Sequence, residues 1–271
     1  MDLSHLGKVV LVGAGKMGMA MAKGWLKFGL MPDSLILVDP NPQKSVVEFA
    51  KFHGVSLFSE MPNIDVNVLI LAVKPQIISA VMSSLKQKIS PDVLVLSIIA
   101  STSINALSDG LGSKNIIRTM PNTPSQVGQG VTGVVAAKSV NEKNKQTAQA
   151  LMAASGMVQW LDDESDLDAL AFVSGCGPAY VFLLIEAMAK AGVEQGLKED
   201  QAMALARQTV IGTATLMQSD DSDVKTLRKN VTSKGGITEA ALSVLMAKDG
   251  FFSLFSKAFK KAKKRNEELA S

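Results

Sequence analysis

The sequence predicts an α/β protein, in which a doubly wound parallel sheet is followed by an all-helical C-terminal domain. Short apolar runs alternate with helix-like segments up to residue 161. A glycine-rich turn joins the first of these runs to the first helix. After Asp162 no strand-like run recurs, and every remaining segment has a helical pattern. We therefore expect one domain over residues 1–162 and a second, helical domain over residues 163–271.

The predicted strands are apolar runs rich in β-branched residues, which suit strands that are buried on both faces. They cover residues 9–12, 35–38, 55–58, 66–73, 93–99, 116–118, 131–136 and 157–161. The helices predicted between them cover residues 17–28, 42–52, 77–88, 104–111 and 141–154. Pro42 suits a first helical turn, and Ser103 suits a helix cap. Helices in the C-terminal part are predicted over residues 178–195, 198–217, 224–229, 238–247 and 252–269.

Composition indicates a soluble, globular chain of 271 residues, 47% of them hydrophobic and 20% charged. A net charge of +3 is too small to argue for nucleic-acid or membrane partners. The single cysteine, Cys176, excludes an internal disulfide and a multi-cysteine zinc site, so we expect a cytoplasmic protein without a metal. We see no signal peptide and no uninterrupted apolar run near the roughly 20 residues of a membrane span. The two histidines, His5 and His53, lie near no catalytic pattern.

The glycine-rich turn has the spacing G-x-G-x-x-G, formed by Gly13, Gly15 and Gly18. It follows a strand and opens a helix, which is the context of a Rossmann-type dinucleotide-binding fold. In that geometry Gly13 makes the tight turn, Gly15 lets the backbone approach a pyrophosphate, and Gly18 lets the helix pack closely on the strand. The alternative is an ordinary glycine-rich turn between a strand and a helix.

Asp39 ends the second predicted strand, about 20 residues after the glycines, where an acidic residue bonds the adenosine ribose in NAD-binding proteins. A carboxylate there would favour NADH over NADPH. In the alternative arrangement Pro40 turns Asp39 away, and Asn41, Lys44 and the next helix N-terminus hold a 2′-phosphate. Both arrangements stay open at this point.

Three polar loops follow or precede predicted elements. Residues 72–76 and 118–124 follow strands, where the loops of a doubly wound sheet line the ligand crevice. Residues 231–238 precede a helix and contain two adjacent glycines flanked by Ser233 and Thr238. Their backbone N–H groups are typical of a nest for a small carboxylate. The plainer alternatives are a structural turn for residues 121–124 and a helix cap for residues 233–238.

Taken together, these segments resemble the pyrroline-5-carboxylate reductase family over nearly the whole chain. The motifs that carry the resemblance are Gly13-Ala14-Gly15-Lys16-Met17-Gly18, Ala72-Val73-Lys74-Pro75, Arg118-Thr119-Met120-Pro121-Asn122-Thr123-Pro124, Val173-Ser174-Gly175-Cys176-Gly177-Pro178-Ala179-Tyr180 and Thr232-Ser233-Lys234-Gly235-Gly236-Ile237-Thr238. Four features depart from the usual family pattern. Cys176 stands in place of Ser, Lys234 in place of Pro, and Pro40 in place of Arg, and Ser97-Ile98-Ile99-Ala100-Ser101 replaces Ser-Ile-Ala-Ala-Gly.

The resemblance implies reduction of 1-pyrroline-5-carboxylate to L-proline with NADP(H) or NAD(H), at a site where the two domains meet. The expected substrate-binding residues are Ser233, Gly235, Gly236, Thr238 and Glu186, with Thr238 also catalytic through a hydrogen bond to the imine. The expected cofactor-binding residues are Gly13, Gly15, Lys16, Met17, Gly18, Asp39, Asn41, Lys44, Ala72, Val73, Lys74, Pro75 and Asn122. The resemblance also implies dimers that assemble into rings.

Several alternatives remain at this point. A β-hydroxyacid dehydrogenase shares the glycine loop but uses a helical lysine, and the helix after Cys176 has none before Lys190. A non-catalytic dinucleotide-sensing module would leave the loop at residues 233–238 unexplained. Glu186, within an apolar helix, is at least as well explained by a structural role at a subunit interface. The excess of apolar residues in the helical part itself favours burial against a second copy of the chain.

Overall fold

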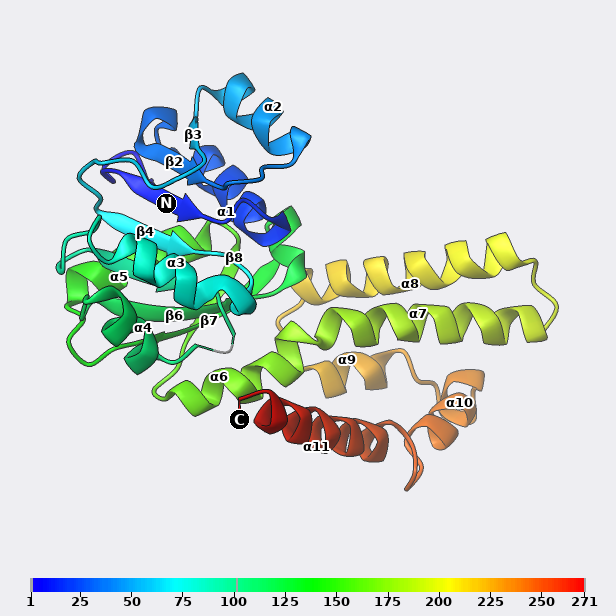
Figure 1. Ribbon diagram of the computed structural model, residues 1–271. Helices are drawn as coiled ribbons and strands as arrows, with labels where there is room; N and C mark the ends of the chain where they lie inside the picture. The colour runs from blue at the N-terminus through cyan, green and yellow to red at the C-terminus, as the bar shows by residue number, and fades with distance from the viewer. Residues whose placement is uncertain (1, 101, 271) are drawn as a thin grey trace. The chain divides into compact units, whose positions relative to one another are not determined.

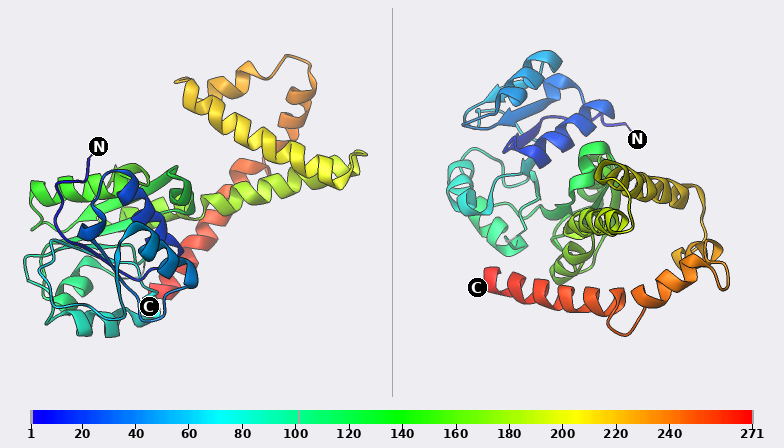
Figure 2. Two further views of the ribbon diagram at one scale, coloured as in Figure 1. Left: turned by 90° about the horizontal axis from the view of Figure 1, so that it is seen from above. Right: turned by 90° about the vertical axis from the view of Figure 1, so that its right-hand side faces the viewer.

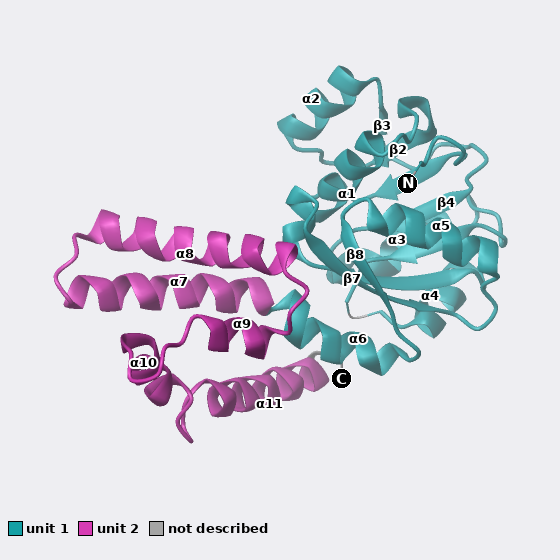
Figure 3. Cartoon of the chain, turned by 180° about the vertical axis from the view of Figure 1, so that it is seen from behind, with its two compact units in different colours: residues 1–176, 270 teal, residues 177–269, 271 magenta. Residues whose placement is uncertain are grey.

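The computed structural model describes residues 2–100 and 102–270, and its compact units divide after Cys176 (Figures 1 and 3). Unit 1 holds the sheet and the helices around it, and unit 2, from Gly177 to Leu269, is helical. The change from strands to helices falls near residue 162, as expected. The first helical segments after residue 162 still belong to unit 1. Leu167 is buried there, and the Leu167 and Leu170 side chains pack against the sheet at Gly133, where a Cβ atom would collide with them. The domain boundary at residue 162 therefore stays a prediction.

Unit 1 is built on one eight-stranded sheet with the strand order β3-β2-β1-β4-β5-β6-β7-β8. The strands are β1 (Val9–Val12), β2 (Leu35–Val38), β3 (Ser56–Phe58), β4 (Val68–Leu71), β5 (Leu94–Ser97), β6 (Ile116–Pro121), β7 (Gly130–Ala136) and β8 (Gly156–Trp160). The order of the first six strands is that of a Rossmann fold. The chain leaves β1 toward β2 on one side and later returns to β4 on the other, which places the ligand crevice at the carboxyl ends of β1 and β4.

The sheet is not parallel throughout, which corrects the sequence-based expectation. Strand β7 pairs antiparallel with β6, while the other neighbouring strands of the described sheet pair parallel. Between β6 and β7 lies only the short 3₁₀ helix η3 (Thr123–Val127), followed by Gly128 with φ +72°. A parallel connection needs a crossover of about a dozen residues or more, so this short link can only reverse the chain.

Helices cover both faces of the sheet, and the alternation of side chains along each strand decides which face each residue supports. Val9 and Leu11 face a core formed with α1 (Lys16–Lys27), α2 (Lys44–His53) and α5 (Glu142–Ala153). Val10 and Val12 face a second core, formed with α3 (Ile78–Leu85) and α4 (Ile104–Leu111). The helix α4 begins at the predicted cap, where the Ser103 hydroxyl oxygen accepts a hydrogen bond from the Ala106 N–H. Unit 1 is completed by η1 (Pro32–Ser34), η2 (Pro75–Ile77), α6 (Glu164–Leu170) and the π-helical turn Ala171–Gly175.

Unit 2 contains α7 (Gly177–Glu194), α8 (Glu199–Ser219), α9 (Val224–Asn230), α10 (Ile237–Leu245) and α11 (Phe251–Ala270). Helices α7 and α8 form a hairpin, drawn in yellow-green and yellow in Figure 2. Among the described residues of this unit, the buried apolar ones are only Ala189, Ala202 and Ala206. Large apolar side chains are exposed instead, including Phe182, Leu183, Ile237 and Phe252. By itself, unit 2 therefore lacks a core of large side chains.

One helical stretch, residues 164–194, is long and apolar enough to cross a membrane by length and composition. Such a stretch was not expected from the sequence. Core helices of soluble proteins pass the same test, so a single stretch of this kind is weak support for a membrane span. The π-helical turn at residues 171–175 also interrupts its regular α-helical geometry.

Candidate functional site

The glycine loop between β1 and α1 adopts the geometry that its spacing predicts. Gly13 has φ +96°, and a Cβ atom there would lie 2.7 Å from the Ala72 carbonyl. A Cβ at Gly18 would lie 2.5 Å from the Gly13 carbonyl oxygen. A Cβ at Gly15, by contrast, would meet no atom within 4 Å. Two glycines are therefore needed for packing, and the third faces open space where a ligand can approach the backbone.

The start of α1 leaves backbone donors without protein partners. Gly15 is the N-cap residue, and its carbonyl accepts the first helical bond from Met19 at 2.9 Å. Within the described chain, no protein group accepts a hydrogen bond from the N–H groups of Gly15, Lys16 or Met17. Unpaired N–H groups at the positive end of a helix dipole form an anion site. They fit the pyrophosphate of a dinucleotide.

Asp39 follows β2 and points back to this loop. One of its carboxylate oxygens, Oδ2, accepts a hydrogen bond from the Ala14 N–H at 2.9 Å. The other, Oδ1, accepts one from the Asn41 N–H, also at 2.9 Å. The expected alternative, in which Pro40 turns the carboxylate away from the loop, does not occur in this structure.

A cleft of about 670 Å³ lies at the carboxyl ends of β1, β2 and β4. This volume is within the usual range for a small-molecule or cofactor site. The cleft brings together seven of the predicted cofactor residues, namely Gly13, Gly15, Asp39, Asn41, Ala72, Val73 and Lys74. Lys16 lines a smaller pocket of about 220 Å³ that shares Gly15 with the cleft.

The other five predicted cofactor residues line neither the cleft nor the smaller pocket. Met17 and Gly18 lie within α1, Pro75 opens η2, and Lys44 begins α2 with its side chain largely exposed. Asn122 is buried, and both ends of its amide engage the backbone: Oδ1 accepts from the Val131 N–H, and Nδ2 donates to the Ser174 carbonyl. In this structure Asn122 therefore joins η3 to β7 and to the π-helical turn.

The polar residues that follow β3 were not predicted from the sequence. Ser59 and Glu60 line the cleft, and Lys88 closes it with a hydrogen bond to the Met61 carbonyl at 3.2 Å. The signal was present, because Ser59 directly follows a predicted strand whose carboxyl end lies at the same edge as that of β2.

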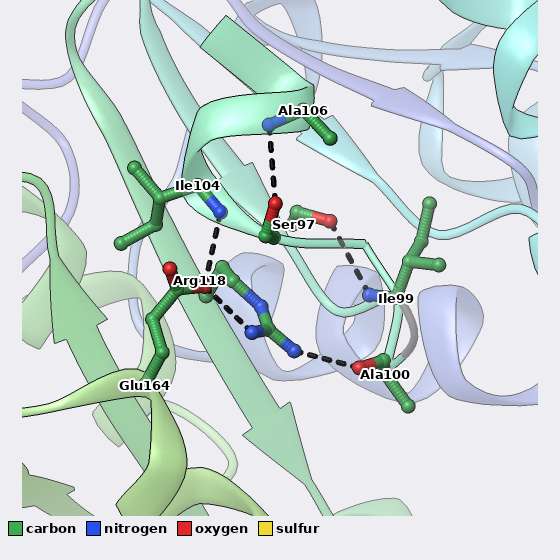
Figure 4. Close-up of polar contacts among 8 residues, drawn as sticks. Ser97, Ile99, Ala100, Ile104, Ala106, Arg118 and Glu164 are labelled. Carbon is green, nitrogen blue, oxygen red and sulfur yellow. Dashed lines mark hydrogen bonds and ion pairs between the residues drawn. The ribbon is translucent and has the colours of Figure 1, made fainter. Parts of the chain in front are cut away.

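An ion pair between the buried Arg118 and the half-buried Glu164 lies beside the loop that follows β5, and it too was not anticipated (Figure 4). Arg118 of β6 donates to the Glu164 carboxylate at 2.6 Å and to the Ala100 carbonyl at 2.6 Å. The same Glu164 oxygen accepts from the Ile104 N–H at 3.0 Å, at the start of α4. The pair thus fixes β6, the loop after β5 and α6 relative to one another. Removing Glu164 would leave the buried Arg118 guanidinium with the Ala100 carbonyl as its remaining partner among these groups, which is costly for a buried charge.

The predicted carboxylate nest lies in unit 2, between α9 and α10. Gly235 has φ +72°, and its N–H donates to the Glu239 carboxylate at 2.7 Å. The Gly236 N–H donates to the Ser233 carbonyl at 3.0 Å. Ser233 and Thr238 are exposed at the two ends of this turn. The loop has the predicted shape, but two of its donors already have partners within the chain.

Two further residues singled out from the sequence are accessible. Glu186 is exposed on α7, in the midst of an apolar stretch of that helix. Cys176 is a free, exposed thiol immediately before α7, and its N–H donates to the Ala171 carbonyl at 2.8 Å. The described residues contain no group of three or more His, Cys, Asp or Glu side chains arranged to hold a metal ion.

The strand order, the glycine loop and the cleft define a Rossmann-type dinucleotide-binding protein with an appended helical unit. Residues 8–101 match the family described as "NADP oxidoreductase coenzyme F420-dependent", and residues 164–269 match "Pyrroline-5-carboxylate reductase dimerisation". The pyrroline-5-carboxylate reductase of Haemophilus influenzae is 36% identical over 264 residues, which span 96% of this chain and 97% of that protein. The chain therefore belongs to the pyrroline-5-carboxylate reductase family.

Solved structures agree with this assignment. A pyrroline-5-carboxylate reductase from Coxiella burnetii superimposes with a TM-score of 0.91 at 33% identity, covering 98% of this chain and 99% of that one. The enzyme from Plasmodium falciparum, solved with NADP bound, gives a TM-score of 0.83 at 29% identity over the full length of both chains. The Rossmann-type fold with a helical C-terminal part is thus confirmed. Membership of this family also sets aside the β-hydroxyacid dehydrogenase alternative.

Proposed function

We propose that this protein reduces 1-pyrroline-5-carboxylate to L-proline, the last step of proline synthesis, with NADPH or NADH as the hydride donor. The observation that carries the proposal is the match to pyrroline-5-carboxylate reductases along 96% of the chain, so that the nucleotide cleft and the helical unit are matched together. A sensing module without catalysis would not need the exposed polar loop of unit 2.

The residues of unit 1 fit a nicotinamide dinucleotide. The unpaired N–H groups of Gly15, Lys16 and Met17 would hold the pyrophosphate. The cleft at the carboxyl ends of β1, β2 and β4 would take the adenosine half. The relative from Plasmodium falciparum was solved with NADP bound, which supports a cofactor of this class.

The bound nicotinamide supplies a hydride to the ring carbon of the C=N bond, and the ring nitrogen gains or keeps a proton to give the secondary amine of proline. The chain's contribution is positioning. We assign the substrate carboxylate to the loop of Ser233, Gly235 and Gly236. The Thr238 hydroxyl donates a hydrogen bond to the imine nitrogen, so no strong general acid is needed. Glu186 is assigned to the surroundings of the substrate on the strength of the family resemblance.

The direct test is to incubate the purified protein with pyrroline-5-carboxylate and either NADPH or NADH. We expect absorbance at 340 nm to fall and proline to form in equal molar amounts. Nucleotide oxidation without proline, or no turnover of a folded protein that binds nucleotide, would contradict the proposal. The latter result would favour a sensing module.

We further propose that unit 2 forms a homodimer, that dimers assemble into rings, and that the protein is cytoplasmic. The match of residues 164–269 to a dimerisation family supports the dimer, as does the exposure of large apolar side chains on a unit that buries only small ones. The same burial would account for the apolar stretch at residues 164–194 without a membrane. Sedimentation velocity at micromolar concentration, together with flotation on lipid vesicles, separates these outcomes. A stable monomer would refute the dimer, and co-flotation would refute the cytoplasmic location.

A further inference from the structure

We infer that Asp39 makes this chain prefer NADH over NADPH, by fixing a carboxylate where the adenosine ribose binds. The inference deepens the proposed function, on which it rests, because it names which of two nucleotides the cleft accepts. It depends on the position of the carboxylate, on what that carboxylate does to neighbouring donors, and on the charges around it.

The position of the carboxylate is fixed by two hydrogen bonds of 2.9 Å. One comes from the Ala14 N–H, inside the glycine loop, and the other from the Asn41 N–H. Because these donors belong to the backbone on two sides of the cleft, the side chain cannot rotate away without losing both bonds. Ala14 is buried, so its N–H would be left without a partner. The negative charge is therefore a fixed part of the nucleotide cleft.

A fixed carboxylate discriminates between the two nucleotides at the ribose 2′ position. Each carboxylate oxygen can accept a second hydrogen bond, which a 2′-hydroxyl can donate. A 2′-phosphate carries negative charge and no comparable donor, so it meets repulsion instead. Binding of acidic side chains to the 2′-hydroxyl is the general rule at the end of the second strand of a Rossmann fold.

The groups that directly follow Asp39, and the Lys44 side chain, offer a 2′-phosphate little compensation. Pro40 has no N–H, and the Asn41 N–H is already bound to Asp39. Lys44 lies 3.8 Å from Glu48, with 91% of its side chain exposed, and it does not line the cleft.

The other charged residues of the cleft do not offset the repulsion between Asp39 and a 2′-phosphate. Lys74 follows β4, which lies on the far side of β1 from β2 and Asp39. Lys88 is bonded to the Met61 carbonyl and lies 4.0 Å from Glu60. Asp39 is thus the charged residue that directly follows β2, where the adenosine ribose binds in a Rossmann fold.

One competing location exists. The smaller pocket beside Gly15 is lined by Lys16, Lys23, Gln43 and Ser45, and two lysines would attract a phosphate. Asp39 does not line that pocket. If the 2′-phosphate bound there, the protein would prefer NADPH, and Lys23→Met would abolish the preference. This outcome would overturn the inference.

The test measures nucleotide binding rather than turnover. Dissociation constants for NADH, NADPH, ADP-ribose and 2′-phospho-ADP-ribose are determined by titration calorimetry on the full-length protein without substrate. We expect the wild type to bind each nucleotide without the 2′-phosphate roughly tenfold or more tightly, given typical coupling energies for close charges. Asp39→Ser should shift the ratio by at least about tenfold toward the phosphorylated form. Asp109→Asn removes the same charge from the exposed surface of α4, outside the cleft, and should leave the ratio within about twofold.

Each remaining result is decisive. Tighter binding of NADPH by the wild type, or equal weakening of both nucleotides by Asp39→Ser, would overturn the inference and leave the proposed function intact. An equal shift in Asp109→Asn would attribute the preference to net charge and also overturn it. If neither nucleotide binds to a folded wild type, the proposed function itself fails. Asp39→Asn serves as a second variant should thermal unfolding show that the serine variant is not folded.

Discussion

The two glycine-rich loops of this protein hold their shapes by different means. The loop after β1 is held by the core: Gly13 lies against the Ala72 carbonyl, and Gly18 lies against Gly13. The loop before α10 is exposed, and a Cβ at Gly235 would meet no atom within 4 Å. Its main restraint is the Glu239 carboxylate, which accepts the Gly235 N–H at 2.7 Å. Packing thus fixes the first loop, and a local hydrogen bond fixes the second.

The difference has a functional meaning. In the first loop the donors at the start of α1 stay unpaired, because surrounding strands and helices keep the backbone in place without them. In the second loop a carboxylate of the chain already uses a donor that we assign to the substrate carboxylate. An anion that binds the first loop finds donors that are already free, whereas one that binds the second must compete with Glu239.

The largest expected effect is on the free energy of unfolding, and its size should differ between Gly13 and Gly235. Gly13→Ala would place a Cβ 2.7 Å from backbone atoms at φ +96°, and we expect a loss of about 3–5 kcal/mol in the free energy of unfolding. Gly235→Ala has the same kind of φ but open space, and should cost only about 1–2 kcal/mol. Urea denaturation followed by circular dichroism measures both. Equal losses would show that packing does not distinguish the loops.

The next effect concerns catalysis by the exposed loop. We expect Thr238→Ala to lower kcat about 10- to 100-fold, because the imine nitrogen loses a hydrogen bond that strengthens as the amine forms. Thr238→Ser keeps the hydroxyl and should retain most of the activity. The dissociation constant for nucleotide, which depends on unit 1, should not change in either variant. Unchanged kcat in a folded alanine variant would remove Thr238 from the site.

A smaller effect tests the competition within the exposed loop. Glu239→Gln keeps an oxygen for the Gly235 N–H but removes the negative charge, so the KM for pyrroline-5-carboxylate should fall about two- to fivefold with kcat unchanged. Glu199→Gln is the matched control, since Glu199 lies in the first turn of α8 as Glu239 lies in the first turn of α10. A higher KM in the Glu239 variant would mean that the carboxylate supports binding by ordering the loop.

The contrast between the two loops also shows which features can be predicted from the sequence. The first loop was predicted well, because spacing, flanking strands and the position of Asp39 are local features with a fixed geometric meaning. The partners of Asp39 were not predictable, since its contact with Ala14 depends on the register between β1 and β2. The antiparallel strand β7 was missed because the length of a connecting link indicates direction only once both strand ends are known.

Contacts between residues distant in sequence were also missed. The pair of Arg118 and Glu164 joins residues 46 positions apart, and no local pattern marks either one. Asn122 was assigned to the cofactor from its motif, yet its amide bonds two backbone segments. In the exposed loop the glycines predicted the turn, but the role of Glu239 as its internal acceptor was not anticipated.

The smallest expected effect concerns the third glycine-rich turn, Gly175-Cys176-Gly177, which is held by a backbone hydrogen bond and not by close packing against its glycines. The Cys176 N–H donates to the Ala171 carbonyl at 2.8 Å within the π-helical turn, and its thiol is exposed. Cys176→Ser preserves the backbone bond and nearly the same side-chain size. Hydride transfer needs no nucleophile, so the variant should keep kcat and both KM values within about twofold. Modification of the wild type by iodoacetamide is the second measurement, because it adds bulk where serine does not. Loss of activity in the serine variant, with the circular dichroism spectrum unchanged, would show that the thiol takes part in the reaction. Loss on alkylation alone would show only that this turn lies close to bound ligand.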